Sequence, residues 1–308
     1  MLKYRPNINS IKSIRLEAYQ MSILRKRISA ILLSLAMVTA VALPTFADDT
    51  QSYTPMQISA ESEAFPQAYI EIENGTTLMA RDGTTHLSGA SVTVYYEEHY
   101  KYDSQGNLFI TDSRLLSEDE VNAIGKENFD EGAPSLTREV SNTRGKLTIR
   151  MDGSYSTSGN SLTAFFSAMG NWSGTGSDPS ACPSSGADVA GFHWGGNIST
   201  GETTARGEYG DNSSATVTLA GGTSNEAIAW YFTEKEAFKY IKNVFFNLNM
   251  SKSSLTGNGN TTELYFTYIH TYQSYNVTGS ISASGAGISI SNVANQWPLS
   301  VRLYGIPY

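Results

Sequence analysis

The residues best suited to bind a ligand are aromatic side chains beside glycine-rich segments. Trp172 and Trp194 each fall near the end of an alternating run, and His193 precedes Trp194 in Gly191-Phe-His-Trp-Gly-Gly196. Flat rings stack on apolar sugar faces while neighbouring loops supply hydrogen bonds. The sequence therefore predicts a glycan or other cell-surface ligand at Trp172, His193 and Trp194. The alternative for each tryptophan is a buried place in a β-sandwich core.

Nucleophilic catalysis has weak support. Cys182 is the only cysteine, and it could form a dyad with His193. No cation stands near it in sequence to lower its thiol pKa, so an incidental surface thiol is the favoured interpretation. No Gly-x-Ser-x-Gly elbow occurs. We predict no catalytic residue.

The sequence support for metal binding is equally weak. Glu97 and His99 lie two residues apart and would share one strand face, as half of a metal site. The favoured alternative is a solvated Glu/His face on an edge strand. The chain has four histidines in all: His86, His99, His193 and His270. We predict neither a metal nor a cofactor.

Glycoside hydrolysis would need two carboxylates facing each other across a cleft. Acidic residues are few after residue 145, and most fall at expected turns: Asp152, Asp178, Asp188, Glu202, Glu208, Asp211, Glu226, Glu234, Glu236 and Glu263. A secreted hydrolase therefore stays an alternative without assigned residues.

A membrane hairpin is a further alternative. Residues 275–293 alternate small polar with apolar side chains and carry no charge. Such arms approach the roughly 10 residues that a membrane β-strand needs. An ordinary half-buried hairpin has the same pattern and is favoured, with a pore-forming or host-directed factor as the runner-up.

The elements that position these residues are predominantly β. Period-two alternation recurs, for example at Leu147, Ile149 and Met151, between turns rich in Gly, Asn and Ser. This predicts an all-β, antiparallel β-sandwich or barrel-like fold. Capping boxes at Ser117–Glu120 and Thr233–Glu236 predict one or two short helices.

The N-terminal region predicts export. Residues 21–47 have a basic start, an apolar run and a small-residue ending, so we expect a signal peptide cleaved after Ala47. Residues 1–20 are interpreted as a mis-assigned upstream extension, and 48–66 as a disordered lead-in. We then expect a small β-hairpin module with a short helix at 67–130 and the main sandwich at 137–308. After cleavage the protein would hold no stable membrane span.

Charge and cysteine content indicate which classes of partner and which compartment suit this protein. The chain has 21 basic and 29 acidic residues, and residues 1–47 contain seven of the basic residues and one of the acidic residues. The mature chain therefore has a net charge of −14. A strongly acidic protein is unsuited to nucleic acid or anionic membranes. A single cysteine allows no internal disulfide, which suits a bacterial cell surface or medium better than a eukaryotic one. The sequence as a whole favours a protein exported by a Gram-positive bacterium. The sequence thus favours a secreted or cell-surface binding protein over an enzyme.

Overall fold

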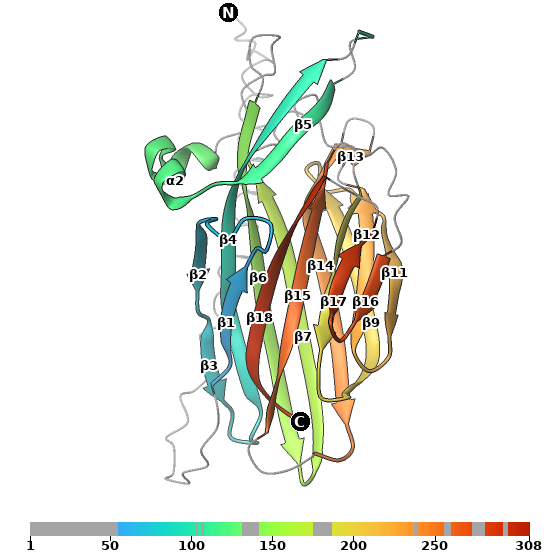
Figure 1. Ribbon diagram of the computed structural model, residues 1–308. Helices are drawn as coiled ribbons and strands as arrows, with labels where there is room; N and C mark the ends of the chain where they lie inside the picture. Colours follow the sequence, from blue (N-terminus) through green and yellow to red (C-terminus); the bar gives the residue numbers. More distant parts are fainter. Residues whose placement is uncertain are drawn as a thin grey trace, which may run out of the picture. The chain divides into compact units, whose positions relative to one another are not determined.

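The computed structural model describes residues 55–102, 104–105, 108–130, 142–174, 187–233, 235–236, 239–255, 260–272, 281–291 and 295–308 (Figure 1). The predicted signal peptide at 21–47, the extension at 1–20 and Cys182 lie outside these residues. The described chain consists mostly of antiparallel β-sheets, as the alternation predicts.

The smaller of the two main sheets has six strands. Their spatial order is β1 (Gln57–Glu61), β18 (Gln296–Pro307), β15 (Thr261–Thr271), β8 (Ala187–Trp194), β12 (Ala227–Thr233) and β11 (Val217–Thr223). Every neighbouring pair is antiparallel. The order differs from the chain order, so strands far apart in sequence build each face.

The larger sheet has ten strands. Its main path is β10 (Ser214–Ala215), β9 (Ser199–Tyr209), β14 (Lys239–Lys252), β7 (Ser161–Ser173), β6 (Asn142–Ser158), β4 (Thr85–Tyr102) and β2 (Ile70–Glu73). Three further strands attach to its sides: β13 (Lys235–Glu236) to β14, and β3 (Thr76–Met79) and β5 (Leu108–Leu115) to β4.

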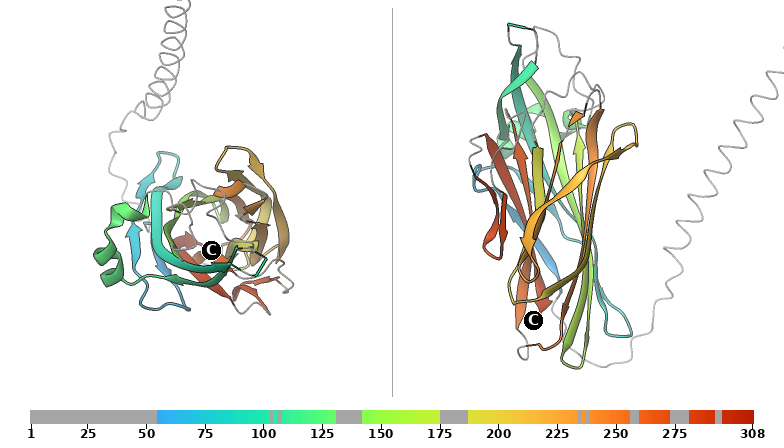
Figure 2. Two further views of the ribbon diagram at one scale, coloured as in Figure 1. Left: turned by 90° about the horizontal axis from the view of Figure 1, so that it is seen from above. Right: turned by 90° about the vertical axis from the view of Figure 1, so that its right-hand side faces the viewer.

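The two sheets share one hydrophobic core, which makes the fold β-sandwich-like (Figure 2). Phe246 of the larger sheet lies 5.4 Å, centroid to centroid, from Phe266 of the smaller sheet and 5.4 Å from Trp230. Burying one such side chain stabilises the fold by about 1.5–3 kcal/mol. The period-two alternation places these residues inward because successive side chains point to opposite faces.

A third, two-stranded sheet lies on the outside of the six-stranded sheet. Strands β16 (Ile281–Ser284) and β17 (Gly287–Ile290) pair only with each other among the described residues. In Figure 1 this hairpin lies in front of β11 and β12, and its apolar side chains belong to one cluster with Ala220 of β11 and Ala229 of β12. Within the stretch 275–293, the described residues 281–291 form a half-buried hairpin, the interpretation that the sequence favoured.

The first capping box forms as predicted. Helix α2 (Glu118–Ile124) begins after Ser117, whose backbone N–H donates to Glu120 Oε2 at 2.9 Å. A 3₁₀ turn, η1 (Lys126–Phe129), follows directly. The second box does not make a helix: β12 runs through Thr233, and Lys235–Glu236 forms β13. Pairing with β14 overrides the local capping signal there.

One other local prediction is wrong. The segment expected as a disordered lead-in contains β1, because Ile58 is buried and the strand pairs along β18. The dipeptide Asn74-Gly75, which is typical of hairpin turns, does not reverse the chain, since β2 and β3 both pair with β4. A Cβ on Gly75 would lie 2.5 Å from the Ser88 carbonyl oxygen, so glycine permits this close approach.

The predicted modules at 67–130 and 137–308 share one sheet. Strand β4 pairs with β6 from Thr85↔Tyr155 to His99↔Asn142. Val92 of β4 and Ile149 of β6 are register partners with no exposed surface in the same core. The structure therefore differs from the predicted division, because β4 of the first predicted module pairs with β6 of the second.

Candidate functional site

Trp172 belongs to the sandwich interior. Its side chain is 7% exposed, and its indole Nε1 donates to the hydroxyl of Tyr268 at 2.9 Å. Its ring packs edge-on against Tyr96, with centroids 5.1 Å apart. The residue sits on the inward parity of β7 with Phe166 and Ala168. Its indole face is therefore occupied by protein.

Trp194 is buried more deeply. It is 1% exposed, and its indole Nε1 donates to the Ile198 carbonyl oxygen at 2.8 Å. The expectation that these loop-end tryptophans face solvent is wrong, and the core alternative is correct for both. The reason is strand parity: Trp194 points inward with Phe192, whereas His193 points to the outer face.

His193 lines a cavity of about 630 Å³ on the outer face of the six-stranded sheet. The residue is 7% exposed. Its ring stacks on Tyr265, its cross-strand partner, at 4.6 Å between centroids and 11° between planes. Its Nε2 lies 3.3 Å from Thr267 Oγ1, whereas its Nδ1 has no hydrogen-bond partner among the described residues. This orphaned nitrogen belongs to a side chain that lines the cavity.

Burial controls the protonation of His193. It lowers the pKa to about 4 because the charged form loses its hydration, while the nearby Gly285 backbone acts weakly in the opposite direction. At neutral pH the imidazole is therefore uncharged and can accept or donate one hydrogen bond at Nδ1.

The cavity lies between the sheet and the β16–β17 hairpin, and we call it the hairpin groove. Its lining is dominated by hydroxyl, amide and carboxylate groups: Glu61, Glu63, His193, Tyr265, Thr267, Ile269, Ser282, Ser284, Gly285, Ala286, Gly287, Ile288, Ser289, Ile290, Gln296, Pro298 and Ser300. Four of the strands and both hairpin arms thus contribute to one concavity.

The hairpin is held by apolar contacts on one side of the groove. Ile288 and Ile290 pack with Val189, Ala229 and Ile269 in a cluster separate from the main core. The Gly285 N–H also donates to Glu226 Oε2 at 3.3 Å. These contacts position the hairpin serines at the groove.

The opposite wall carries two carboxylates. Glu61 ends β1 and Glu63 follows two residues later, while the Ser62 hydroxyl between them donates to the Pro298 carbonyl oxygen at 2.7 Å. This bond fixes the segment on β18. Both glutamates are exposed, and neither forms an ion pair among the described residues.

A cation lies nearby in the sheet but is already paired. Arg302 faces Ser59 across the β1–β18 ladder and forms an ion pair with Glu263. Glu263 also accepts from the Tyr265 hydroxyl at 2.6 Å. Hydrogen bonds from Arg302 and Tyr265 lower the pKa of the Glu263 carboxyl.

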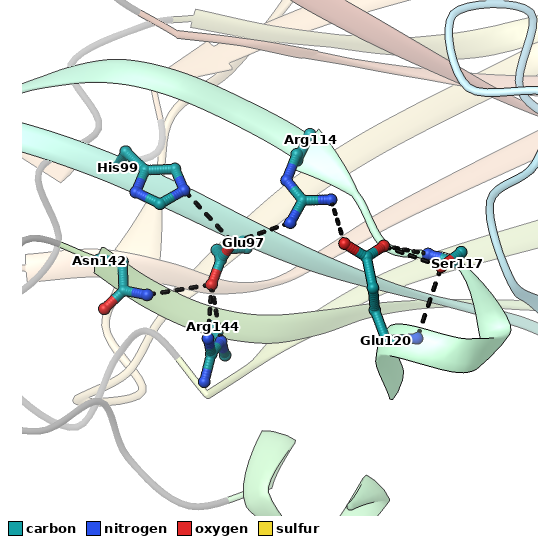
Figure 3. Close-up of polar contacts among 7 residues, drawn as sticks. All are labelled: Glu97, His99, Arg114, Ser117, Glu120, Asn142 and Arg144. Atoms are coloured by element: carbon teal, nitrogen blue, oxygen red, sulfur yellow. Dashed lines mark hydrogen bonds and ion pairs between the residues drawn. The ribbon is translucent and has the colours of Figure 1, made fainter. Parts of the chain in front are cut away.

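A second polar cluster surrounds Glu97 on β4 (Figure 3). Its carboxylate accepts from Arg144 Nε at 2.8 Å, from Arg114 Nη2 at 3.0 Å and from Asn142 Nδ2 at 3.0 Å, and His99 Nε2 lies 3.3 Å away. Burial acts to raise the pKa of Glu97, but Arg144, Arg114 and Asn142 outweigh it and lower the pKa.

This cluster corrects the predicted solvated Glu/His face. Glu97 is 5% exposed, and β4 lies between β5 and β6 at this point rather than at an edge. Arg114 also donates to Glu120 at 2.8 Å, which ties α2 to the sheet. The Ser117 backbone N–H and Arg114 lower the pKa of Glu120 to about 2. The arginines occupy the carboxylate oxygens, so the cluster is a structural clamp.

A third cluster is closed to solvent. His270 lies between two carboxylates, with Nε2 3.0 Å from Glu98 Oε1 and Nδ1 3.2 Å from Asp188 Oδ1. Asp188 also accepts from the Tyr268 hydroxyl at 2.7 Å and from the Thr271 N–H at 2.9 Å. No member is more than 3% exposed, so this cluster joins the sheets and offers no surface to a substrate.

Comparison with known proteins identifies no family. No family model and no curated protein matches the sequence. One solved structure, described as the complete structure of manganese lipoxygenase of Gaeumannomyces graminis and partial structure of zonadhesin of Komagataella pastoris, is 8% identical. Its TM-score is 0.23 over 86% of this chain and 87% of that chain, which is too low to show a shared fold.

Two further features, a membrane-crossing helix and a metal cluster, are absent from the described residues. None of their helices combines the length and apolar character needed to cross a bilayer. They contain no group of three or more His, Cys, Asp or Glu residues placed to hold a metal ion. The hairpin groove is the candidate site because it is a concavity lined by polar side chains, and of the predicted residues it contains His193.

Proposed function

We propose that this chain is an exported protein that binds a hydroxyl-rich ligand, a glycan, in the hairpin groove. The observation that carries the proposal is the lining: serine hydroxyls from the hairpin face a sheet surface that presents Thr267, Tyr265 and His193 around one cavity. Small-ligand sites are concave and place a few polar groups around a partly apolar surface.

The groove offers both kinds of contact that a sugar needs. Ser282, Ser284 and Ser289 supply hydroxyls that donate and accept hydrogen bonds. Ile269 and Pro298 supply apolar surface on the sheet side. Its volume of about 630 Å³ lies within the roughly 300–1,000 Å³ of ordinary ligand pockets.

Binding fits the groove better than catalysis. A general base works best with a pKa near the operating pH. Burial lowers the pKa of His193 to about 4, so at neutral pH it is a weak proton acceptor. Its ring partner is Tyr265 and its Nε2 partner is Thr267, so none of the described carboxylates orients the imidazole as a general base.

The export part of the proposal rests on sequence. The basic residues 25–27, the apolar run that follows and the small residue Ala47 support secretion or surface display. N-terminal sequencing of the exported protein tests it. A mature chain that begins at Asp48 is expected, and an intracellular chain that keeps residues 21–47 would refute it.

Glycan binding is tested with arrays and calorimetry on the exported protein. The variant His193→Phe keeps an aromatic ring against Tyr265 but removes the nitrogen that lines the groove. We expect the bound glycan to lose affinity by about tenfold, the effect of one lost hydrogen bond. Thermal unfolding confirms that the variant still folds.

The matched control is His86→Phe. His86 lies on β4 of the other sheet and is exposed, so its replacement should leave glycan affinity unchanged. Equal losses in both variants would contradict a site at the groove. The absence of binding by the unmodified protein to any glycan would end the proposal.

A further inference from the structure

Two buried side-chain atoms at the hairpin groove have no hydrogen-bond partner among the described residues: His193 Nδ1 and Gln296 Oε1. The amide oxygen of Gln296 only accepts, whereas His193 Nδ1 accepts in one tautomer and donates in the other. The Gln296 amide is oriented by its Nε2, which donates to the Ile290 carbonyl oxygen at 3.3 Å. That bond leaves its Oε1 as the unpaired acceptor, and both residues line the groove.

The carboxylates of Glu61 and Glu63 add negative charge to the same lining. Each other side chain of the lining is uncharged at neutral pH, because the buried imidazole of His193 titrates near pH 4. The neighbouring guanidinium of Arg302 is engaged with Glu263. Among the described residues the two carboxylates of the groove have no counter-charge, which favours a cationic ligand.

An ammonium group matches these features because it donates three hydrogen bonds and accepts none. It would select the His193 tautomer in which Nε2–H donates to Thr267 Oγ1 and Nδ1 accepts. A ligand that only accepts, such as a phosphate or a carboxylate, would meet like charges and leave Gln296 Oε1 unpaired.

We propose that the hairpin groove selects amino sugars, that is, glycans whose free amine is protonated, over N-acetylated or neutral sugars. This inference rests on the proposed function and names its ligand class. The serine hydroxyls of the hairpin contact the sugar hydroxyls, and the unpaired acceptors with Glu61 and Glu63 receive the ammonium group.

The experiment compares three oligosaccharides of equal length by calorimetry: glucosamine, N-acetylglucosamine and glucose oligomers. The glucosamine oligomer should bind about five- to tenfold more tightly, since exposed ion pairs are weak individually. Raising the salt to 0.5 M should remove most of this preference, because salt screens exposed charges.

Substitutions locate the preference. The double variant Glu61→Gln, Glu63→Gln should bring glucosamine affinity to the level of the neutral sugars while the affinity for glucose oligomers stays unchanged. The matched control is Glu73→Gln, an exposed carboxylate on β2 whose contact is the Ser91 hydroxyl. It should leave all three affinities unchanged.

The outcomes separate the two proposals. Equal affinity for the three sugars, or the same loss in the Glu73 variant, would overturn amine selection while glycan binding stands. No binding of any sugar would overturn both. A preference that survives in the double variant would place the amine elsewhere and also refute the inference.

Discussion

Glu98 of the ten-stranded sheet and His270 of the six-stranded sheet meet inside the protein, with 3.0 Å between Oε1 and Nε2. The other ring nitrogen of His270 lies 3.2 Å from Asp188 Oδ1. An ionised carboxylate accepts hydrogen bonds only, so a proton must lie between each ring nitrogen and its carboxylate. One imidazole therefore links both sheets through two buried acids.

Replacing His270 with leucine should destabilise the protein by about 3–5 kcal/mol, because both carboxylates lose a buried partner. Urea unfolding measures the free energy. The matched control is His86→Leu at an exposed position, which should change stability by less than about 0.5 kcal/mol. Equal small changes in the two variants would show that the cluster contributes nothing to stability.

The buried imidazole of His193 should make stability depend on pH. Its folded pKa of about 4 lies below the ordinary value near 6.5, so between these values the unfolded chain binds more protons. Stability is then complete above pH 6.5 and falls by about 3 kcal/mol as pH drops towards 4. Unfolding curves at pH 7 and 4.5 measure this.

The variant His193→Phe isolates that contribution, since other acids titrate in the same range. The difference between the unmodified protein and the variant should shrink or reverse as the pH falls from 7 to 4.5. A difference that stays constant would show that folding does not shift the pKa of His193.

Truncating Trp194 should test whether it is a core residue. Trp194→Ala removes an indole that is 1% exposed and should cost about 3–5 kcal/mol, with loss of the near-ultraviolet circular dichroism of a packed indole. Tyr231→Ala, at an exposed site on β12, should cost much less. A folded, fully stable Trp194 variant would contradict the packing.

The Glu97 clamp should also respond to charge removal. Glu97→Gln leaves Arg114 and Arg144 without their shared carboxylate and should destabilise by about 1–3 kcal/mol. The variant should also lose part of its acid sensitivity, because a lowered carboxyl pKa contributes stability above about pH 4.5 that disappears as pH falls. Chemical unfolding at pH 7 and 3.5 distinguishes these effects.

Local patterns predicted much of the fold. Alternation at Leu147, Ile149 and Met151 located β6, and the capping box at Ser117 located α2. The errors occur where pairing between distant segments decides the outcome. Thr233–Glu236 has the residues of a helix start, but β14 pairs with Lys235–Glu236. Ile58 sits in a polar, proline-containing stretch, but its strand pairs along β18.

The site was harder to predict because its parts are distant in sequence. Glu61 and Gln296 lie at opposite ends of the described chain, and neither belongs to a motif. The alternation of side chains along a strand was the one sequence signal for this site. Trp194 and Phe192 share one face of β8, so His193 must lie on the other face. Only the position of the hairpin shows that this outer face is partly covered.

The β16–β17 hairpin meets the six-stranded sheet through side chains, chiefly Ile288 and Ile290, outside the main core. One wall of the groove is consequently the ten-residue segment 281–290, whose apolar cluster is separate from the main core of the sandwich. Substitutions on the groove side of this segment would therefore change the lining of the groove and leave the contacts between the two large sheets intact.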